Sequence, residues 1–405
     1  MRLRARVLDP VSVDEARYLP DALVEVDPAG RLTLVEPWSG GPCDEDLRPG
    51  LLTPGFVDAH LHFPQTRIVG AASGPLLEWL RTRTFPEEAR FAQADHARAV
   101  AEQFTASLAA AGTTLCQAYG SVHPLAAELL FQALDARGLR AIAGPVLMDQ
   151  GAPDELLLPA GPALDALEAL AERWHGHDGR LQVAVIPRFA LSCTMPMMQA
   201  AGQLARRRGL WVSTHLSENG EECSATTSLF QAADYLSVYE QAGLLHERSI
   251  YAHCIHLSDS EWDRFAGSGA AVAHCPDSND FLGSGGMPLR SVLDRDIPLA
   301  LGSDIAAGRS FRIPRIASSA FDNALRQGQR TSPARWFWTA TRGGALALQQ
   351  PQVGALQPGL EADMVLHSLP EWVEDPQDVL NTLLFHQDAP PVLRTWVRGR
   401  TVSQR

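Results

Sequence analysis

The stretch Leu51-Leu52-Thr53-Pro54-Gly55-Phe56-Val57-Asp58-Ala59-His60-Leu61-His62 decides how we read the rest of this chain. It is an apolar run, typical of a buried strand, that ends in two histidines two positions apart. Because side chains alternate along a strand, His60 and His62 point to the same side. If the strand belongs to a closed barrel, both imidazoles face its mouth and can share one metal ion. Surface histidines at a strand end are the alternative, and His175-Gly176-His177 has the same spacing in a polar stretch that predicts a loop.

Apolar segments alternate with amphipathic ones between residues 54 and 350, which favours a parallel α/β arrangement. Predicted helices include residues 96–110 and 196–208. Eight strand–helix units over about 300 residues predict a (β/α)8 barrel of the TIM type. The predicted strands are Gly55–His60, Thr113–Ala118, Arg140–Leu147, Leu181–Pro187, Leu210–His215, Ser249–His253, Ala270–His274 and Pro298–Gly302.

The two ends of the chain predict a second, smaller β-domain. Short β-like runs lie at residues 4–8, 21–26 and 31–35, and again at 363–366 and 394–397. Proline and glycine separate several of them, as expected for strands joined by turns. We expect the N- and C-terminal segments to pair into a small β-sandwich. The predicted division is residues 1–50 with 355–405 for the β-domain and residues 51–354 for the barrel.

The composition is that of a soluble globular protein, with 45% hydrophobic and 20% charged residues among 405. The 34 basic and 47 acidic residues give a net charge of −13, which disfavours nucleic acid as a partner. All 34 basic residues are arginine, because the sequence contains no lysine. Schiff-base chemistry, a P-loop lysine and a metal bridge through a carbamylated lysine are therefore excluded.

The cysteines and the apolar runs indicate the cellular compartment of the protein. The six cysteines form no Cys-x-x-Cys pair, and most lie in apolar runs, as small core residues do in a reducing compartment. The first residues lack the apolar stretch of a signal peptide. No apolar run approaches the roughly 20 residues that cross a bilayer. We therefore expect a cytoplasmic protein with no membrane partner.

Several predicted barrel strands end in a residue that can bind a metal or move a proton. The carboxyl ends of barrel strands converge on one face, so residues far apart in sequence become neighbours there. Three histidines and an aspartate suit a zinc site that keeps room for water, whose pKa the metal lowers from ~15.7 toward ~7. The strand-end residues are His60, His62, His215, His253, His274 and Asp304.

Two carboxylates near these strand ends are candidates for proton transfer. Asp304 can both bind a metal and accept a proton from water. Glu218 follows His215 by three positions, in Thr214-His215-Leu216-Ser217-Glu218-Asn219, which places its carboxylate over the mouth of the barrel. The alternative for Glu218 is a carboxylate that only stabilises the N-terminus of a helix.

These motifs resemble the amidohydrolase superfamily over almost the whole chain, from residues 54–62 to the segment 354–365. The lack of lysine agrees with the branch that uses one metal ion. Within that branch, Ala273-His274-Cys275-Pro276-Asp277-Ser278-Asn279 resembles the His-Cys-Pro-x-Ser-Asn signature of deaminases that act on aromatic heterocycles.

A narrower resemblance is to the guanine deaminase family. It implies hydrolytic deamination of guanine to xanthine and ammonia, an aminopurine as the small-molecule partner, and a homodimer. The segments that carry it are 64–66, 76–80, 84–88, 146–149, 187–190, 214–219 and 281–285.

The same resemblance implies roles for individual residues. The implied ligands of one divalent metal ion, zinc or alternatively iron(II), are His60, His62, His215 and Asp304. The implied catalytic residues are Asp304, the proton-shuttling Glu218 and His253, which contacts the activated water. The implied substrate contacts are Gln65, Arg188, Phe189, Glu218 and His253.

Some alternatives stay open at the level of sequence. Arg188 and Gln65 can donate hydrogen bonds to a purine carbonyl, whereas a surface ion pair is the other interpretation of Arg188. Trp79 can cover the pocket or simply pack in the core. In the segment 302–309, Ser303 and two alanines stand where the family more often has threonine and glycines. The ring could therefore be a pterin, an oxidised purine or an s-triazine, and ring-opening hydrolysis of a cyclic amide or loss of catalysis are further alternatives.

Overall fold

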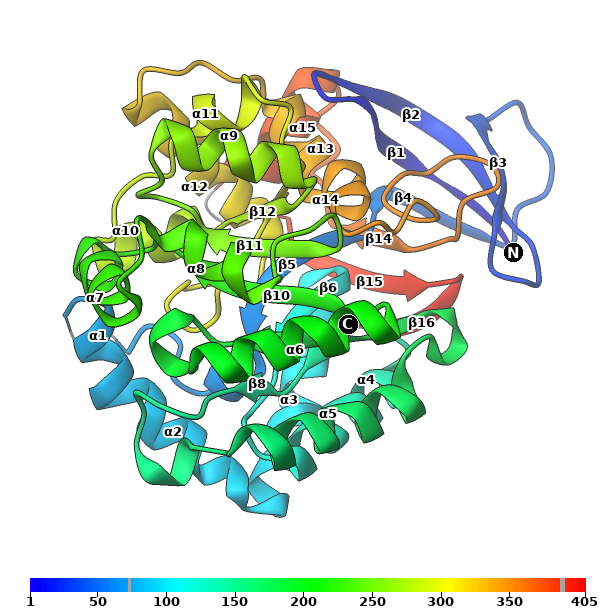
Figure 1. Cartoon of the computed structure of the whole chain (residues 1–405). Coiled ribbons are helices and arrows are strands. Elements are labelled where there is room, and N and C mark those ends of the chain that lie inside the picture. Colours follow the sequence, from blue (N-terminus) through cyan, green and yellow to red (C-terminus); the bar gives the residue numbers. More distant parts are fainter. Residues whose placement is uncertain (72–73, 387–389) are drawn as a thin grey trace.

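The fully buried strand β5 (Phe56–His62) begins a parallel barrel in the computed structural model, which describes residues 1–71, 74–386 and 390–405 (Figure 1). Residues 72–73 and 387–389 fall within the two predicted domains and lie outside the described residues. The sheet runs in the order β5-β6-β7-β9-β10-β11-β12-β13, and β8 pairs with β9. Its other strands are β6 (Thr113–Tyr119), β7 (Arg140–Gly144), β8 (Val146–Leu147), β9 (Leu181–Pro187), β10 (Trp211–Leu216), β11 (Ser249–His253), β12 (Ala271–His274) and β13 (Leu299–Leu301).

The eight predicted strands and the barrel are confirmed, with small differences at the strand ends. All the pairings in this sheet are parallel, and its strands are buried on both faces, which explains their nearly continuous apolar sequences. The third predicted strand is divided into β7 and β8 at Pro145, because proline has no N–H to donate to the ladder.

Two backbone hydrogen bonds close the barrel beyond the end of β13. The Asp304 N–H donates to the His60 carbonyl at 2.8 Å, and the His62 N–H donates to the Ile305 carbonyl at 3.0 Å. Gly302 permits this close approach, since a Cβ there would lie 2.8 Å from the His60 Cβ. The contact that closes the barrel therefore also places His60 beside Asp304.

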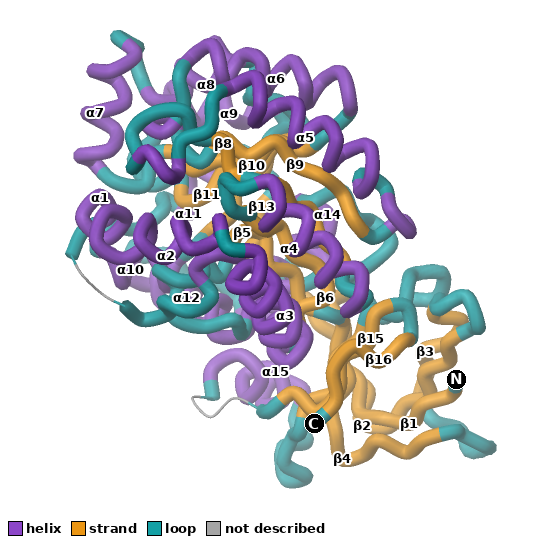
Figure 2. Tube along the Cα trace, turned by 90° about the horizontal axis from the view of Figure 1, so that it is seen from below, coloured by secondary structure: helices purple, strands orange, loops and turns teal. Residues whose placement is uncertain are grey.

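Helices surround the barrel strands (Figure 2). The predicted helices at 96–110 and 196–208 are confirmed as α3 (Ala94–Ala111) and α6 (Met195–Arg208), and a glycine with positive φ ends each of them. Between β5 and α3 the chain forms α1 (Leu76–Trp79), a π-helical turn (Leu80–Thr84) and α2 (Phe85–Ala89). The remaining helices are α4 (Pro124–Arg137), α5 (Ala160–Trp174), α7 (Gly220–Phe230), α8 (Tyr235–Ala242), α9 (Asp259–Ser268), α10 (Pro276–Leu282), α11 (Leu289–Leu293), α12 (Ile313–Arg326), α13 (Pro333–Ala340), α14 (Arg342–Ala347) and α15 (Pro376–Phe385).

The two ends of the chain form a seven-stranded sheet beside the barrel, so the predicted small β-domain is confirmed (Figure 1). Strand β4 bonds to β1 in parallel and to β14 in antiparallel fashion, which joins the N- and C-terminal strands in one continuous sheet. The domain boundaries at residues 50 and 355 stay predictions, and β4 runs across the first. The strands are β1 (Arg2–Ser12), β2 (Glu15–Val26), β3 (Leu32–Pro37), β4 (Glu45–Pro54), β14 (Met364–His367), β15 (Val392–Val397) and β16 (Arg400–Gln404).

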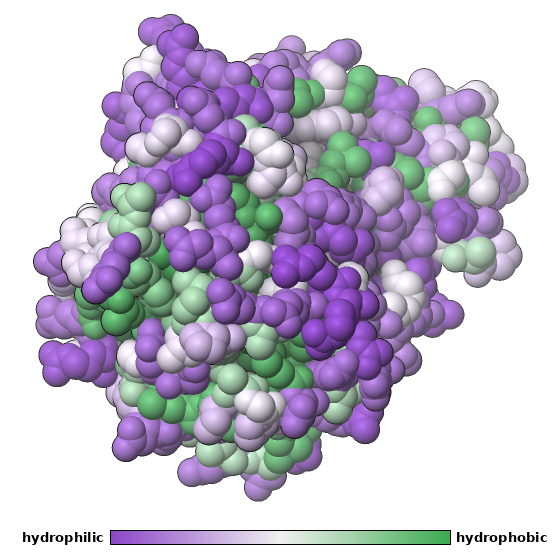
Figure 3. Space-filling model, in the orientation of Figure 1, coloured by the Kyte–Doolittle hydropathy of each residue, from purple (hydrophilic) through white to green (hydrophobic). Residues whose placement is uncertain are grey.

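Hydrophilic residues cover most of the face shown in Figure 3, with hydrophobic residues in smaller groups between them. No helix in the described parts of the chain has the length and apolar character needed to cross a membrane. All six cysteines are free, and four of them are buried.

A buried ion network joins the barrel to the small sheet. Arg140 begins β7, and its fully buried side chain contacts Glu361 and lies 2.7 Å (Nε to Oδ2) from Asp363, next to β14. Arg398, between β15 and β16, binds Glu361 at 2.8 Å. If one partner of such a pair is removed, the other charge stays buried without compensation, which strongly destabilises the fold.

We expect Arg140→Met to lower the free energy of unfolding by about 3–5 kcal/mol, because it removes the buried cation between two carboxylates. Arg290→Met is the control, since the Arg290–Asp294 pair is exposed and should contribute no more than about 0.5 kcal/mol. Denaturant unfolding curves of both variants measure the difference. Equal losses would contradict the structural role given to Arg140.

Candidate active site

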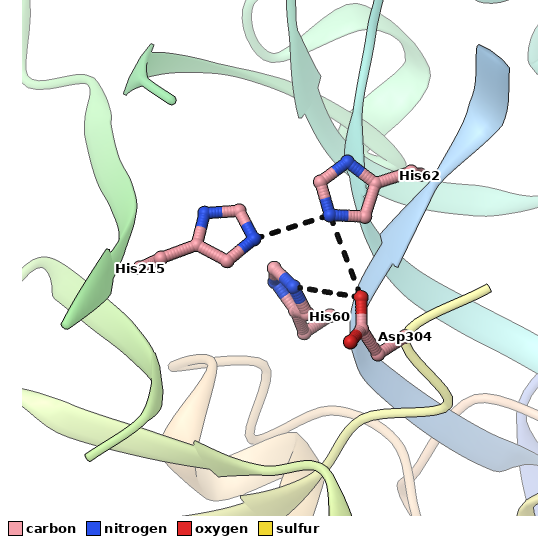
Figure 4. Close-up of side chains that lie close together, drawn as sticks. All are labelled: His60, His62, His215 and Asp304. Carbon is pink, nitrogen blue, oxygen red and sulfur yellow. Dashed lines mark hydrogen bonds and ion pairs between the residues drawn. The ribbon is translucent and has the colours of Figure 1, made fainter. Parts of the chain in front are cut away.

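Four side chains from three separate parts of the barrel meet at its carboxyl-terminal face (Figure 4). His60 and His62 come from β5, His215 from β10, and Asp304 from the segment after β13. The Asp304 Oδ1 lies 3.3 Å from the His60 Nε2 and 3.5 Å from the His62 Nε2, and the Nε2 atoms of His62 and His215 are 3.2 Å apart. One ligand atom from each residue lies within 4.8 Å of the others, so the group can hold a single metal ion.

The hydrogen bonds of these histidines leave nitrogen lone pairs facing one another. The His215 Nδ1 lies 2.5 Å from the Arg188 carbonyl, which can only accept, so Nδ1 carries the hydrogen and the Nε2 of the neutral ring has the lone pair. The His60 Nε2 and Nδ1 and the His62 Nδ1 are buried without a hydrogen-bond partner. Buried polar atoms rarely remain unpaired. A cation between these rings would give the His60 Nε2 a partner and could accept the lone pairs of the neighbouring Nε2 atoms, so the residues present fit a metal ion.

Burial sets the charge of the group. Desolvation lowers the pKa of His60, and that of His62 and His215 still further, so the rings are neutral near pH 7, which is the form that binds metals. Desolvation opposes ionisation of Asp304 as well, but its close contact with His60, with smaller effects of His253 and Ser278, holds its pKa below the ordinary value. Three neutral bases and one carboxylate therefore face a common centre.

His253 lies beside this group rather than within it. Its Nε2 is 3.4 Å from the Glu218 Oε2 and 3.9 Å from the Asp304 Oδ2, and its Nδ1 is 2.8 Å from the Asn279 Oδ1. His253 and Asp304 both have positive φ, 72° and 48°. Non-glycine residues in that region are uncommon and gather at functional sites. The backbone thus turns sharply at two strand ends and directs both side chains inward.

Glu218 is a buried carboxylate in the loop between β10 and α7. Its Oε1 accepts a hydrogen bond from the Ser284 hydroxyl at 3.3 Å, and its N–H donates to the Glu222 Oε2 at 3.0 Å. Asn219, not Glu218, caps α7. Burial, followed by the charges of Asp304 and Glu222, raises the pKa of Glu218 well above its ordinary value. A carboxyl that holds its proton more readily than usual is suited to proton transfer.

A pocket opens beside the histidines. Its lining combines apolar side chains with a few polar and charged groups, as is typical of sites for small molecules. Trp79 lines it and donates its indole N–H to the Ala71 carbonyl, so this residue both packs and forms a pocket wall. The pocket residues are His62, Gln65, Leu76, Trp79, Leu80, Arg188, Phe189, His215, Glu218, Glu222, Leu282, Asp304 and Ala307.

The pocket also contains two hydrogen-bond donors, Arg188 and Gln65. Arg188 follows β9 and is buried, and its Nη1 lies 2.5 Å from the Glu88 Oε2. It is therefore in an ion pair, as the alternative interpretation supposed, but a buried one. Gln65 follows β5, donates to the Glu88 Oε1 at 3.1 Å and accepts from the Ala306 N–H at 3.1 Å. Phe189 completes this part of the pocket wall.

The comparisons with known proteins agree with this geometry. The pattern described as the amidohydrolase family matches residues 51–402. This chain belongs to the amidohydrolase family. Within that family it is 36% identical to a guanine deaminase of Escherichia coli, an alignment that covers 96% of this chain and 92% of the relative.

Solved structures of amidohydrolase family members have the same fold. The structure of the E. coli guanine deaminase superimposes with a TM-score of 0.95 at 34% identity and covers 100% of this chain and 99% of that one. A guanine deaminase from C. acetobutylicum with bound guanine in the active site has a TM-score of 0.93 at 28% identity and covers 99% of each chain. The similarity therefore includes the barrel and the small sheet together.

His274 is the one strand-end residue that does not join the others. It ends β12, but its buried ring faces Trp336 of α13, with centroids 6.2 Å apart. Burial lowers its pKa to about 3. A position at the end of a barrel strand is therefore not enough to predict that a residue joins the site. The alternation of side chains along the strand also decides which side of the sheet the residue faces.

Three residues at this site have roles that the sequence did not indicate. Glu88 binds both pocket donors, Glu222 accepts from the backbone N–H of Glu218, and Ser284 donates to its carboxylate. The sequence contains only a weak sign of the role of Glu88. Glu87 and Glu88 follow Phe85-Pro86 in an apolar context, and a glutamate that is buried there needs a charged or polar partner. Nothing local to Glu222 or Ser284 pointed to Glu218.

The two His-x-His pairs of this chain provide a matched test of the metal site. We expect the intact protein to bind close to one divalent metal ion per chain, and His62→Ala to weaken that binding by roughly 100-fold or more, because a ligand is lost. His177→Ala should retain the metal, since His177 is a half-exposed residue paired with Asp135 outside the barrel. Elemental analysis after dialysis gives the metal content. Equal retention by both variants would remove His62 from the site.

Proposed function

We propose that this protein is a metal-dependent guanine deaminase, which converts guanine and water to xanthine and ammonia. The observation that carries the proposal is the layout of one pocket. The histidine and aspartate group, the carboxylate Glu218 and the donors Arg188 and Gln65 all meet at this pocket. The similarity to guanine deaminases over nearly the whole chain supports the same substrate.

In this reaction, a water oxygen bonds to the amino-bearing ring carbon, and one water proton goes to a ring nitrogen. The second water proton goes to the amino nitrogen as its bond to the carbon breaks, so that ammonia leaves and a carbonyl remains. Glu218 takes the proton from water and delivers it to the ring nitrogen, a role that suits its raised pKa. Arg188 and Gln65 hold the purine carbonyl by donating hydrogen bonds, and Phe189 packs beside the ring. His253 and Asp304 orient the attacking water.

We assign the metal to His60, His62, His215 and Asp304, whose three imidazoles and one carboxylate suit zinc and leave room for water. A bound divalent cation supplies the acidity that makes water a nucleophile near neutral pH. Iron(II) accepts the same ligands and is the second choice. Metal replacement followed by activity measurements distinguishes the two.

The resemblance to this family also bears on the oligomeric state and the cellular location of the protein. We infer a homodimeric cytoplasmic enzyme of purine breakdown, with neither nucleic acid nor a membrane as partner. Sedimentation of the purified protein tests the oligomeric state, and fractionation of the producing cells tests the location.

Ammonia release from guanine by the metal-loaded protein is the direct test. We expect Glu218→Gln to lower kcat by about 10²- to 10⁴-fold, because the amide cannot carry the proton. Glu221→Gln is the control, an exposed change three residues away in α7 that should leave kcat unchanged. Asp304→Asn should abolish turnover together with metal binding.

Assays with other ring substrates define the results that would contradict this proposal. Ammonia from a pterin, an oxidised purine or an s-triazine, with none from guanine, would keep the reaction and overturn the roles of Arg188 and Gln65. Ring opening without ammonia release would indicate a cyclic amidohydrolase. No turnover of any such ring would reject the deaminase.

A further inference from the structure

The carboxylate of Glu88 binds both pocket donors. Its Oε2 lies 2.5 Å from the Arg188 Nη1, and its Oε1 accepts from the Gln65 Nε2 at 3.1 Å. All three side chains are buried. Phe85, one turn earlier in the same segment, lies 5.6 Å from the Arg188 guanidinium, measured to its ring centroid. The segment before α3 therefore fixes the position of both donors.

This contact also removes a net charge from the donor side of the pocket. The Arg188 guanidinium is positive, and Glu88 balances it at close range in a region with little water. The remaining Arg188 nitrogens, Nε and Nη2, have no protein partner among the described residues and so remain available to a ligand. His123, whose pKa the charge of Glu88 also affects, adds no positive charge, because burial lowers its pKa.

We propose that Glu88 is a positioning residue that makes the donor side of the pocket neutral, so that the site favours an uncharged carbonyl-bearing purine over an anionic one. The inference rests on the proposed function and extends it to product release. Xanthine has a carbonyl where guanine has its amino group, which makes it the stronger acid of the two. A neutral pocket holds the xanthine anion less tightly than a positively charged pocket would.

The neighbouring glutamate provides a matched control. Glu87 lies on the same short helix and is also buried, but it binds Arg90 at 2.7 Å and His96 at 3.0 Å. Neither Glu87 nor its two partners lines the pocket. Replacing Glu87 therefore removes a buried carboxylate and its partners from α2 without changing the charge beside the ligand.

The test compares two ring ligands by calorimetry on the metal-loaded protein at mildly alkaline pH. Hypoxanthine lacks the amino group and is mostly neutral there, whereas xanthine is mostly anionic. In Glu88→Gln we expect the preference for xanthine over hypoxanthine to rise about tenfold or more, because Arg188 is then unbalanced. Glu88→Asp keeps the charge and should keep the original preference, as should Glu87→Gln.

Calorimetry measures ligand binding and not turnover, so the test remains informative if Glu88→Gln loses activity. Thermal unfolding checks that each variant is folded. An equal loss of affinity for both ligands in Glu88→Gln would mean that Glu88 has only a structural role and would overturn the inference. The same shift of preference in Glu87→Gln would also overturn it. Turnover of guanine by the unaltered protein is measured alongside. Its absence rejects the proposed function, whereas turnover with an unchanged preference in Glu88→Gln rejects only the role of Glu88.

Discussion

The structure depends on the place where the first and eighth strands of the barrel meet. Two backbone hydrogen bonds there join the carbonyl of His60 to the N–H of Asp304 and the N–H of His62 to the carbonyl of Ile305. Strand β13 itself is short, so these bonds complete the sheet at its carboxyl-terminal end. A side chain at Gly302 would collide with His60. The constraint that closes the fold and the constraint that brings His60 and His62 to Asp304 are therefore the same.

Much of this arrangement could be predicted because its signals are local. Each barrel strand is an apolar run, and four of these runs lead directly into His60, His62, His215, His253 or Asp304. Once the barrel is inferred, the convergence of strand ends places these residues together without further information. The predicted strands of the small sheet do not include β4, whose first half, Glu45-Asp46-Leu47-Arg48-Pro49, contains no apolar run. Its partners β1 and β14 are far away in sequence.

The remaining site residues could not be predicted, since their roles depend on contacts between distant segments. Glu88 and Arg188 are 100 residues apart, and Ser284 and Glu218 are 66 apart. His274, in contrast, was included among the candidate site residues although it does not reach the site. It ends a strand as the others do, but it faces Trp336 rather than the pocket. Position along the sequence places a residue at the correct end of the barrel. The side of the sheet that it faces, and its partner, are decided by packing.

The two halves of the site are built differently, and this separates reaction from selectivity. The three histidines of the metal group project from the barrel strands β5 and β10, and Asp304 follows β13, where its N–H is bonded to the His60 carbonyl of β5. Leu76, Trp79 and Leu80 of the pocket wall, and the Glu88 that holds its donors, come instead from the single connection between β5 and α3. Connections tolerate sequence change far better than barrel strands do. A chain of this fold can therefore change much of the pocket wall by altering this connection, while the metal group and Arg188, which follows β9, stay in place.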